Sequence, residues 1–315
     1  MSGVKNGVDK KFYELIKLVN ESGYDGLCDL MKHYVNKLNG HNLYDYMILS
    51  YNAPENEGFW GKINPKENVY ELIENRARTL IHHMKDFEWL YEELGDYRSK
   101  NVLYSILANW ITFNWEYLSE VREKQFKDYF DLDLIPEISE NEIFVDLGGY
   151  VGDTIVDFID TYGEMYDQII SYEVDSDNYS KMEMNTERFI GIDLRKKGAG
   201  SENGTMYIKP EGSTTKVADS GENAVDIVRL DDDILYPFTW LKMDIEGAEK
   251  DAIEGARNHI TNEKPKLTIC TYHSNDDIWE IPRVIKDLNS DYKLYMRYYG
   301  GENSLYPCEY VLYAL

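Results

Sequence analysis

The stretch VDLGGYVGDT, residues 145–154, joins a short apolar run to a glycine-rich turn. The run from Ile143 to Leu147 predicts a buried strand, and the apolar positions between Ile155 and Tyr162 predict a helix that ends at Gly163. A strand, a glycine turn and a helix in this order are typical of nucleotide-binding sheets. The residues of the turn decide which nucleotide fits it.

The strand and helix pattern continues beyond this stretch. Helical patterns and short connections separate the apolar runs, which is typical of a parallel sheet covered on both faces. Three glycines and alternating residues between about 200 and 235 interrupt the rhythm and predict a hairpin insertion. The strands predicted after the first are Gln168–Val174, Ile192–Leu194, Trp240–Met243, Leu267–Tyr272, Tyr292–Tyr298 and Glu309–Tyr313.

The first part of the chain, to about residue 130, has its apolar residues at helical spacing. One helix is predicted over Leu27–Leu38 with Gly40 as its stop, and another over Val102–Ile111. A third is predicted to open at Asn64, which can cap it, with Pro65 in the first turn. We therefore expect an all-helical domain over residues 1–135 and an α/β domain over 136–315.

The charge balance limits the partners. The 315 residues include 58 acidic and 33 basic ones, for a formal charge of −25. Such a chain repels phosphate backbones and anionic lipid surfaces, so we expect no nucleic acid and no membrane as partner. Three widely spaced cysteines fit neither a disulfide framework nor a zinc site, and no apolar run is long enough to span a membrane. We expect a cytoplasmic protein.

The turn itself argues against a dinucleotide. A dinucleotide fingerprint has glycines in G-x-G-x-x-G spacing, and position 150 is Tyr. Asp146 stands before Gly148, Gly149 and Gly152, where a carboxylate suits an amine or a sulfonium better than a pyrophosphate. Glu173 follows the second strand, at the place where an acid accepts both hydroxyls of a ribose. Together these residues indicate S-adenosylmethionine, although each alone is also typical of a simple tight turn or a helix cap.

Further polar residues follow the fourth and fifth strands. Asp244 and Glu246 follow the run Trp240–Met243, and His273 follows the strand within LTICTYH. Because ligands bind at the carboxyl ends of parallel strands, these three are candidate catalytic residues. Asp244 is equally suited to act as a structural cap. Glu249, in the next helical turn, is interpreted as an acid that only complements the helix dipole.

The ordered motifs VDLGGYVGDT, YEVD, LKMDIEGAE and KPKLTICTYHSNDDIWEIP resemble those of the FkbM-type S-adenosylmethionine-dependent methyltransferases over about residues 140 to 315. The resemblance implies a Rossmann-like class I methyltransferase sheet, mostly parallel, with an antiparallel strand near the C-terminus. It also implies methylation of a hydroxyl on a sugar, a polyketide or another small molecule. Gly149 and Tyr150 replace the family's common Ala-Asn, so we expect Tyr150 to contact the cofactor through its backbone. The residues assigned to the cofactor are Asp146, Gly148, Gly149, Tyr150, Gly152, Asp153 and Glu173.

Methyl transfer to a hydroxyl needs a base, and His273 is our candidate, with Asp244 or Glu246 orienting it or contacting the acceptor. A divalent cation held by these three residues is possible on the same grounds but is not favoured. Two further functions are compatible with the sequence. One is a nicotinamide-dependent oxidoreductase or epimerase on a similar sheet, and the second is a non-catalytic binding protein that keeps the methyltransferase fold. The helical domain is expected to act as a lid, bind the acceptor or form a homodimer.

Overall fold

The computed structural model describes residues 6–38, 42–53, 56, 58–211, 214–218, 224–301 and 307–315. Seven strands form one mostly parallel sheet in the order β10-β11-β9-β8-β1-β2-β3, with one antiparallel strand at the C-terminal end of the chain. This confirms the Rossmann-like methyltransferase sheet expected from the sequence. Its strands are β1 (Ile143–Leu147), β2 (Gln168–Tyr172), β3 (Ile192–Arg195), β8 (Trp240–Met243), β9 (Lys266–Cys270), β10 (Leu294–Tyr298) and β11 (Tyr310–Ala314).

The chain divides into two compact units that interleave along the sequence. Unit 1 comprises Met1–Lys124, Thr271–Arg283 and Lys293–Leu312, and unit 2 comprises Gln125–Cys270, Val284–Tyr292 and Tyr313–Leu315. The chain passes from the first unit to the second near residue 125 and later returns. The domain boundary expected from the sequence after residue 135 stays a prediction.

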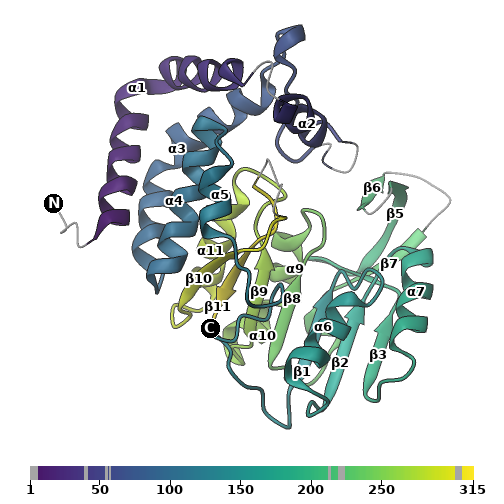
Figure 1. Ribbon diagram of the computed structural model, residues 1–315. Helices are drawn as coiled ribbons and strands as arrows, with labels where there is room; N and C mark the ends of the chain where they lie inside the picture. Colours follow the sequence, from purple (N-terminus) through teal and green to yellow (C-terminus); the bar gives the residue numbers. More distant parts are fainter. Residues whose placement is uncertain are drawn as a thin grey trace. The chain divides into compact units, whose positions relative to one another are not determined.

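Unit 2 is built around β1, which pairs in parallel with β2 on one side and β8 on the other. The rings of Phe144 on β1 and Phe158 on α6 (Asp153–Tyr162) stack 4.7 Å apart, and Trp240 on β8 meets Phe144 edge-on at 5.6 Å. Figure 1 shows α6 beside α7 (Ser176–Thr186), next to β1, β2 and β3. These buried contacts pack the middle of α6 against β1 and β8, and the glycine turn connects β1 to this helix.

A separate sheet in unit 2 contains the predicted hairpin insertion. Its strands β4 (Gly198–Ala199), β5 (Gly204–Glu211), β6 (Thr214–Ala218) and β7 (Ala224–Val228) lie in the order β4-β7-β5-β6. β5 pairs antiparallel with both β6 and β7, as the alternating residues led us to expect. The remaining helices of the second half are α8 (Leu230–Asp233), α9 (Glu249–Gly255), α10 (Arg257–Asn262) and α11 (Asp277–Leu288).

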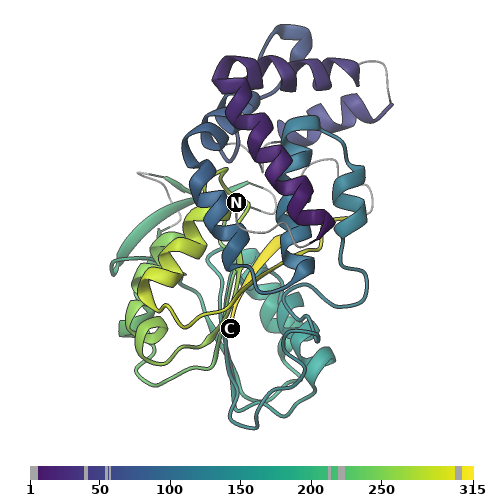
Figure 2. The same cartoon turned by 90° about the vertical axis from the view of Figure 1, so that its left-hand side faces the viewer.

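Unit 1 contains α1 (Gly7–Lys37), α2 (Asn42–Tyr51), α3 (Glu71–Glu93), α4 (Tyr97–Thr112) and α5 (Glu116–Val121). Figures 1 and 2 show α1 as two straight pieces, because Gly23 leaves the helical conformation at φ 62°. The helix predicted at Asn64 is wrong in its start. Pro65–Glu67 forms one 3₁₀ turn without a side-chain cap, Asn68 ends it in a left-handed conformation, and α3 begins at Glu71. The predicted stop Gly40 lies outside the described residues.

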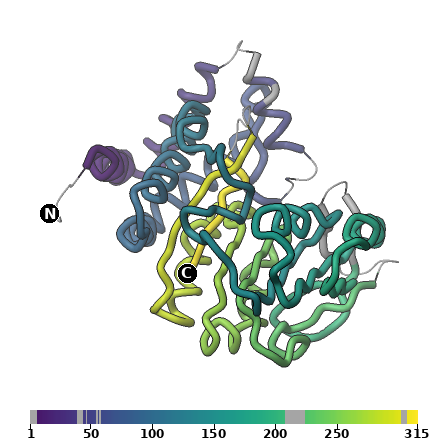
Figure 3. Tube along the Cα trace, turned by 60° about the horizontal axis from the view of Figure 1, so that its bottom comes forward, coloured from purple at the N-terminus to yellow at the C-terminus, as the bar shows by residue number. Residues whose placement is uncertain are grey.

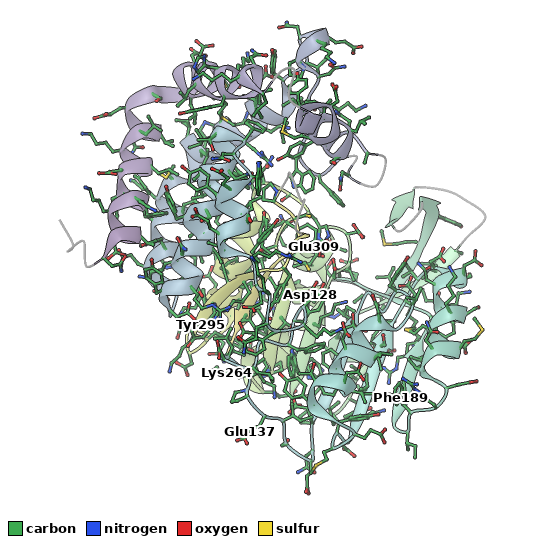
Figure 4. The ribbon with its side chains drawn as sticks, viewed as in Figure 1. Asp128, Glu137, Phe189, Lys264, Tyr295 and Glu309 are labelled. Atoms are coloured by element: carbon green, nitrogen blue, oxygen red, sulfur yellow. The ribbon has the colours of Figure 1, made fainter. Side chains whose placement is uncertain are left out.

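The helices of unit 1 are tied to a strand from the end of the chain. Figure 3 shows β10, in yellow, beside α4 and α5, in blue. The Gly95 N–H donates to the Leu294 carbonyl at 2.8 Å, and the ring of Tyr295, labelled in Figure 4, leaves no room for a side chain at position 95. The N-terminal helices therefore share a core with a strand that is made late in synthesis. Within the described part of the chain, no helix is both long and apolar enough to cross a membrane.

Candidate functional site

The glycine turn after β1 has a shape that only glycine permits at position 148. Gly148 has φ 81°, and a Cβ on it would lie 1.9 Å from the Asp244 carbonyl oxygen. The Asp244 N–H in turn donates to the Leu147 carbonyl at 3.1 Å. The turn is therefore pressed against the segment that follows β8, so two of the predicted site segments meet.

Four backbone N–H groups of the turn already donate hydrogen bonds inside unit 2. Those of Gly148 and Gly149 both donate to the Tyr172 carbonyl, at 3.1 and 2.9 Å. The Tyr150 N–H donates to Glu173 Oε2 at 2.8 Å, and the Gly152 N–H donates to the Gly149 carbonyl at 2.7 Å. Phosphate-binding turns direct such N–H groups at their ligand. This arrangement therefore argues against a pyrophosphate at the turn, as the spacing of the glycines does.

Glu173 is the carboxylate that closes the turn. Its Oε1 accepts the Asp175 N–H at 2.7 Å, while Oε2 accepts the Tyr150 N–H, and its side chain is 7% exposed. Burial raises the pKa of this carboxyl above its usual value, although the backbone N–H groups act against the rise. Each oxygen keeps capacity for another hydrogen bond, so the group can still accept two hydroxyls.

Asp146 lies beneath the turn rather than on its surface. Its carboxylate is 0% exposed, accepts the Ser171 hydroxyl at 2.9 Å and lies 3.0 Å from the Lys242 ammonium. Lys242 also donates to the Gly148 carbonyl at 2.8 Å. The structure thus shows Asp146 buried inside unit 2 and paired with Lys242, and its assignment to the cofactor stays a prediction. The sequence analysis did not identify Lys242 as a site residue. A charged residue in an otherwise apolar strand was the signal that could have indicated it.

A second carboxylate lies near the same lysine. The Tyr129 hydroxyl donates to Asp244 Oδ2 at 2.8 Å, and the Lys242 ammonium lies 5.1 Å from the centroid of the Tyr129 ring. Burial acts to lower the pKa of Lys242, but the charges of Asp146 and Asp244 outweigh it and raise that pKa above its usual range. Lys242 is therefore a permanent buried cation between the two predicted acids.

The acids after Asp244 differ in their surroundings. Glu246 is half-buried and has φ 57°, so it forms the left-handed corner of the turn into α9. Glu249 is buried, its Oε1 accepts the Ile245 N–H at 2.9 Å, and one of its oxygens lies within 4.8 Å of an Asp244 oxygen. The interpretation of Glu249 as only a helix-dipole acid is therefore wrong, because it holds the turn that positions Asp244.

Three of the predicted residues remain, namely Asp153, Tyr150 and His273. Asp153 is exposed at the start of α6, where its carboxylate accepts the Thr154 N–H at 3.1 Å, and the Tyr150 side chain is exposed. His273 belongs to unit 1 and is 2% exposed. Its ring lies 5.1 Å from that of Phe59 and 4.3 Å from that of Tyr272. The structure thus groups the cofactor residues and Asp244 within unit 2 and gives His273 an aromatic setting.

The comparisons with known proteins bear on this arrangement. Residues 146–300 match the model of the methyltransferase FkbM domain, from Asp146 on β1 to Gly300 just after β10. This region of the chain is similar to the FkbM methyltransferase family. The crystal structure of methyltransferase FkbM from Methylobacillus flagellatus KT is similar, with 25% identity and a TM-score of 0.68 over 79% of this chain. The match spans 63% of that protein, so this chain corresponds to less than two thirds of it.

A second solved structure, an rRNA methylase from Streptococcus thermophilus, has 12% identity and a TM-score of 0.37. It matches over 57% of this chain and 90% of that one, and likeness at this level supports no conclusion about function. The search of curated proteins finds no match. The likeness to the FkbM methyltransferase domain covers residues 146–300, and the reaction, its methyl donor and its acceptor are proposed below from the site.

Proposed function

We propose that this protein transfers a methyl group from S-adenosylmethionine to a hydroxyl of a small molecule or glycan. The observation that carries the proposal is the hydrogen bond from the Tyr150 N–H to the Glu173 carboxylate, which joins the glycine turn to the acid after β2. A carboxylate fixed at this place, with capacity left for two hydroxyl donors, suits a ribose. Because the N–H groups of Gly148, Gly149 and Gly152 are engaged within the protein, a nicotinamide dinucleotide is the poorer fit.

The residues of the chain bind the cofactor, position the acceptor and accept a proton. Glu173 accepts the ribose hydroxyls, and the Tyr150 backbone lines the methionine end of the turn. Lys242 and Asp146 hold the turn in shape from below. S-adenosylmethionine supplies an electrophilic methyl group, so the acceptor hydroxyl must lose its proton as the new bond forms. His273 is the proposed proton acceptor, and Asp244 and Glu246 are proposed to orient it or the acceptor.

Titration calorimetry with S-adenosylhomocysteine tests the donor. We expect the wild-type protein to bind it in the micromolar range, and Glu173→Ala to bind at least tenfold more weakly because two hydroxyl acceptors are lost. Glu164→Ala, a substitution of an exposed acid before β2, serves as the control and should bind normally. Failure of the wild-type protein to bind at high micromolar concentration would remove the proposal.

Transfer of labelled methyl groups to a panel of hydroxylated sugars and polyketides tests the acceptor. If His273 accepts the proton, His273→Gln lowers kcat by about 10²-fold or more while S-adenosylhomocysteine affinity stays unchanged. We also propose that the reaction needs no divalent cation, since Lys242 already provides a positive charge near Asp244. Excess chelator should leave the rate unchanged; a loss that Mg²⁺ restores would favour a metal-dependent reaction.

A further inference from the structure

Arg76 on α3 is a buried cation in the interior of unit 1. Arg76 is 1% exposed, and its Nη2 donates to the Tyr51 hydroxyl at 3.0 Å. Its Nε and Nη1 groups are buried and have no hydrogen-bond partner among the residues that the structure describes. Buried guanidinium groups normally satisfy their donors with carboxylates or carbonyls, so this one is incomplete.

Aromatic side chains surround the guanidinium. Its Cζ lies 5.0 Å from the ring centroid of Tyr51, 5.2 Å from that of Trp110 and 5.8 Å from that of Phe113. The indole N–H of Trp110 is also buried without a partner in the described part of the chain. The orphaned groups of Arg76 and Trp110 are therefore all donors, and a single hydrogen-bond acceptor placed among them would satisfy several.

Among the residues that the structure describes, the charge of Arg76 also lacks a direct counter-ion. None of the described carboxylates forms an ion pair with it. Arg76 acts to lower the pKa of the buried Tyr310 hydroxyl, and the carboxylate of Asp277 acts to raise it. Both charges therefore influence the same hydroxyl without being paired directly. An unpaired charge in an apolar interior is costly, so a ligand that pairs with it would bind favourably.

We propose that Arg76 and Trp110 form a binding site for an anionic group, namely a carboxylate, phosphate or sulfate carried by the methyl acceptor. We call the guanidinium of Arg76 with the rings of Tyr51, Trp110 and Phe113 the cage. An anion fits the cage because it offers a positive charge and the orphaned donors of Arg76 and Trp110 among aromatic rings. The planar fork of the guanidinium can hold two oxygens of such a group at once.

The position of this cage within unit 1 links it to the acceptor. A continuous series of rings connects it to His273: Tyr51 lies 5.9 Å from Trp60, Trp60 lies 5.7 Å from Phe59, and Phe59 lies 5.1 Å from His273. An acceptor held by its acidic group at Arg76 thus binds to the same unit as the proposed proton acceptor. This assignment to the acceptor rests on the proposed function; the anion site itself does not.

Thermal unfolding at constant ionic strength tests the anion site with sodium acetate and sodium phosphate against sodium chloride. We expect acetate, phosphate or both to raise the Tm of the wild-type protein by at least about 2 °C. The effective anion identifies the chemical class. Arg76→Met should lose this rise, and its Tm in chloride should not fall, because the substitution removes an unpaired buried charge.

Arg297→Met is the matched control, because Arg297 is equally buried but pairs with Asp96 at 2.8 Å. It should have a lower Tm in chloride and keep the anion effect. If neither anion raises the wild-type Tm, or if Arg76→Met keeps the rise, the anion site is refuted. Should Arg76→Met fail to fold, Arg76→Lys replaces it, and its rise should be smaller than that of the wild type because the two-oxygen fork is lost.

Two further measurements separate this proposal from the proposed function. S-adenosylhomocysteine should bind Arg76→Met as it binds the wild type, and kcat/KM should fall at least tenfold for acidic acceptors only. An equal fall for neutral acceptors would contradict the assignment to the acceptor. If the wild type responds to anions but does not bind S-adenosylhomocysteine, the proposed function fails and the anion site stands.

Discussion

The ammonium of Lys242 lies 3.0 Å from the carboxylate of Asp146, with both side chains shielded from solvent. The same ammonium holds the Gly148 carbonyl, and the same carboxylate holds the Ser171 hydroxyl. One buried ion pair therefore joins β8, β1, β2 and the glycine turn. The conformation of the glycine turn is therefore determined by the buried residues beneath it.

Lys242→Met should destabilise the protein by about 3–5 kcal/mol, because it leaves the Asp146 carboxylate buried without its cation. Urea unfolding at pH 7 measures the loss. Arg257→Met, which removes an exposed ion pair with Glu254, should cost less than about 1 kcal/mol. Equal losses in the two variants would show that the buried pair has no special role.

Gly148→Ala and Gly163→Ala separate backbone strain from steric conflict. Both residues have positive φ, 81° and 79°, but a Cβ at 163 would meet nothing within 4 Å, whereas one at 148 would meet the Asp244 carbonyl. We expect a loss of about 1 kcal/mol at 163 and more than about 3 kcal/mol at 148. Similar losses at both positions would mean that the segment after β8 can move away from the turn.

The affinity for S-adenosylhomocysteine should depend on pH through Glu173. The ligand hydroxyls need the ionised carboxylate, and burial raises the pKa of that group above 4.5. Affinity should therefore fall as the pH is lowered, and the fall should begin above the range where an exposed glutamate protonates. Calorimetry between pH 8 and pH 5 measures it. Glu173→Gln should bind weakly with no such dependence; a parallel decline in both would assign it to another group.

Tyr150→Ala should keep most of its affinity for S-adenosylhomocysteine. The contact made by this residue in the turn is its backbone N–H on Glu173, and its side chain is exposed. A change of less than about threefold in Kd is expected, since the backbone donor remains. Complete loss of binding would show that the ring itself contacts the cofactor.

Asp96→Asn should lower stability in a pH-dependent way. Asp96 caps α4 by accepting the Ser99 N–H at 2.7 Å and pairs with the buried Arg297. Burial opposes ionisation of Asp96, but the hydrogen bonds from Arg297 and Ser99 outweigh it and lower its pKa. Since asparagine keeps the cap, the loss of about 2–4 kcal/mol reports the charge.

This contribution of Asp96 is fully present above pH 3.8, the usual pKa of the carboxyl, and disappears as the pH falls through the lower pKa of the folded state. The difference between wild type and Asp96→Asn should therefore shrink below about pH 4. Unfolding curves at pH 7 and pH 3 decide the point. A constant difference at both pH values would indicate that the geometry, rather than the charge, is responsible.

Much of the fold could be predicted because local patterns specify it. The run Ile143–Leu147 and the stop at Gly163 define β1 and α6 as observed. The helix start at Asn64 could not be predicted in the same way, since a capping residue and a proline also suit a single 3₁₀ turn. Local signals do not say whether a turn of helix continues.

The sequence positions of the site residues could be predicted, but fewer of their side-chain contacts could be. The glycine spacing and the acid after β2 indicated that the turn and Glu173 belong together, and a hydrogen bond joins them. The pairing of Asp146 with Lys242, and that of Asp244 with Tyr129, depends on contacts between residues far apart in sequence. No periodicity carries that information, although a lysine inside an apolar strand indicates that it needs a buried acid.

The interleaving of the two units has a consequence for biosynthesis. The N-terminal helices reach the ribosome exit first, and α4 can pack on α1 and α5 early, yet it lacks one further partner until β10 has been made. During that interval Val102, Ile106 and other apolar residues of α4 have no complete core to enter. A fragment ending at residue 124 should therefore aggregate or bind chaperones, and a circular permutant that joins β10 directly to the helices should fold faster than the natural chain.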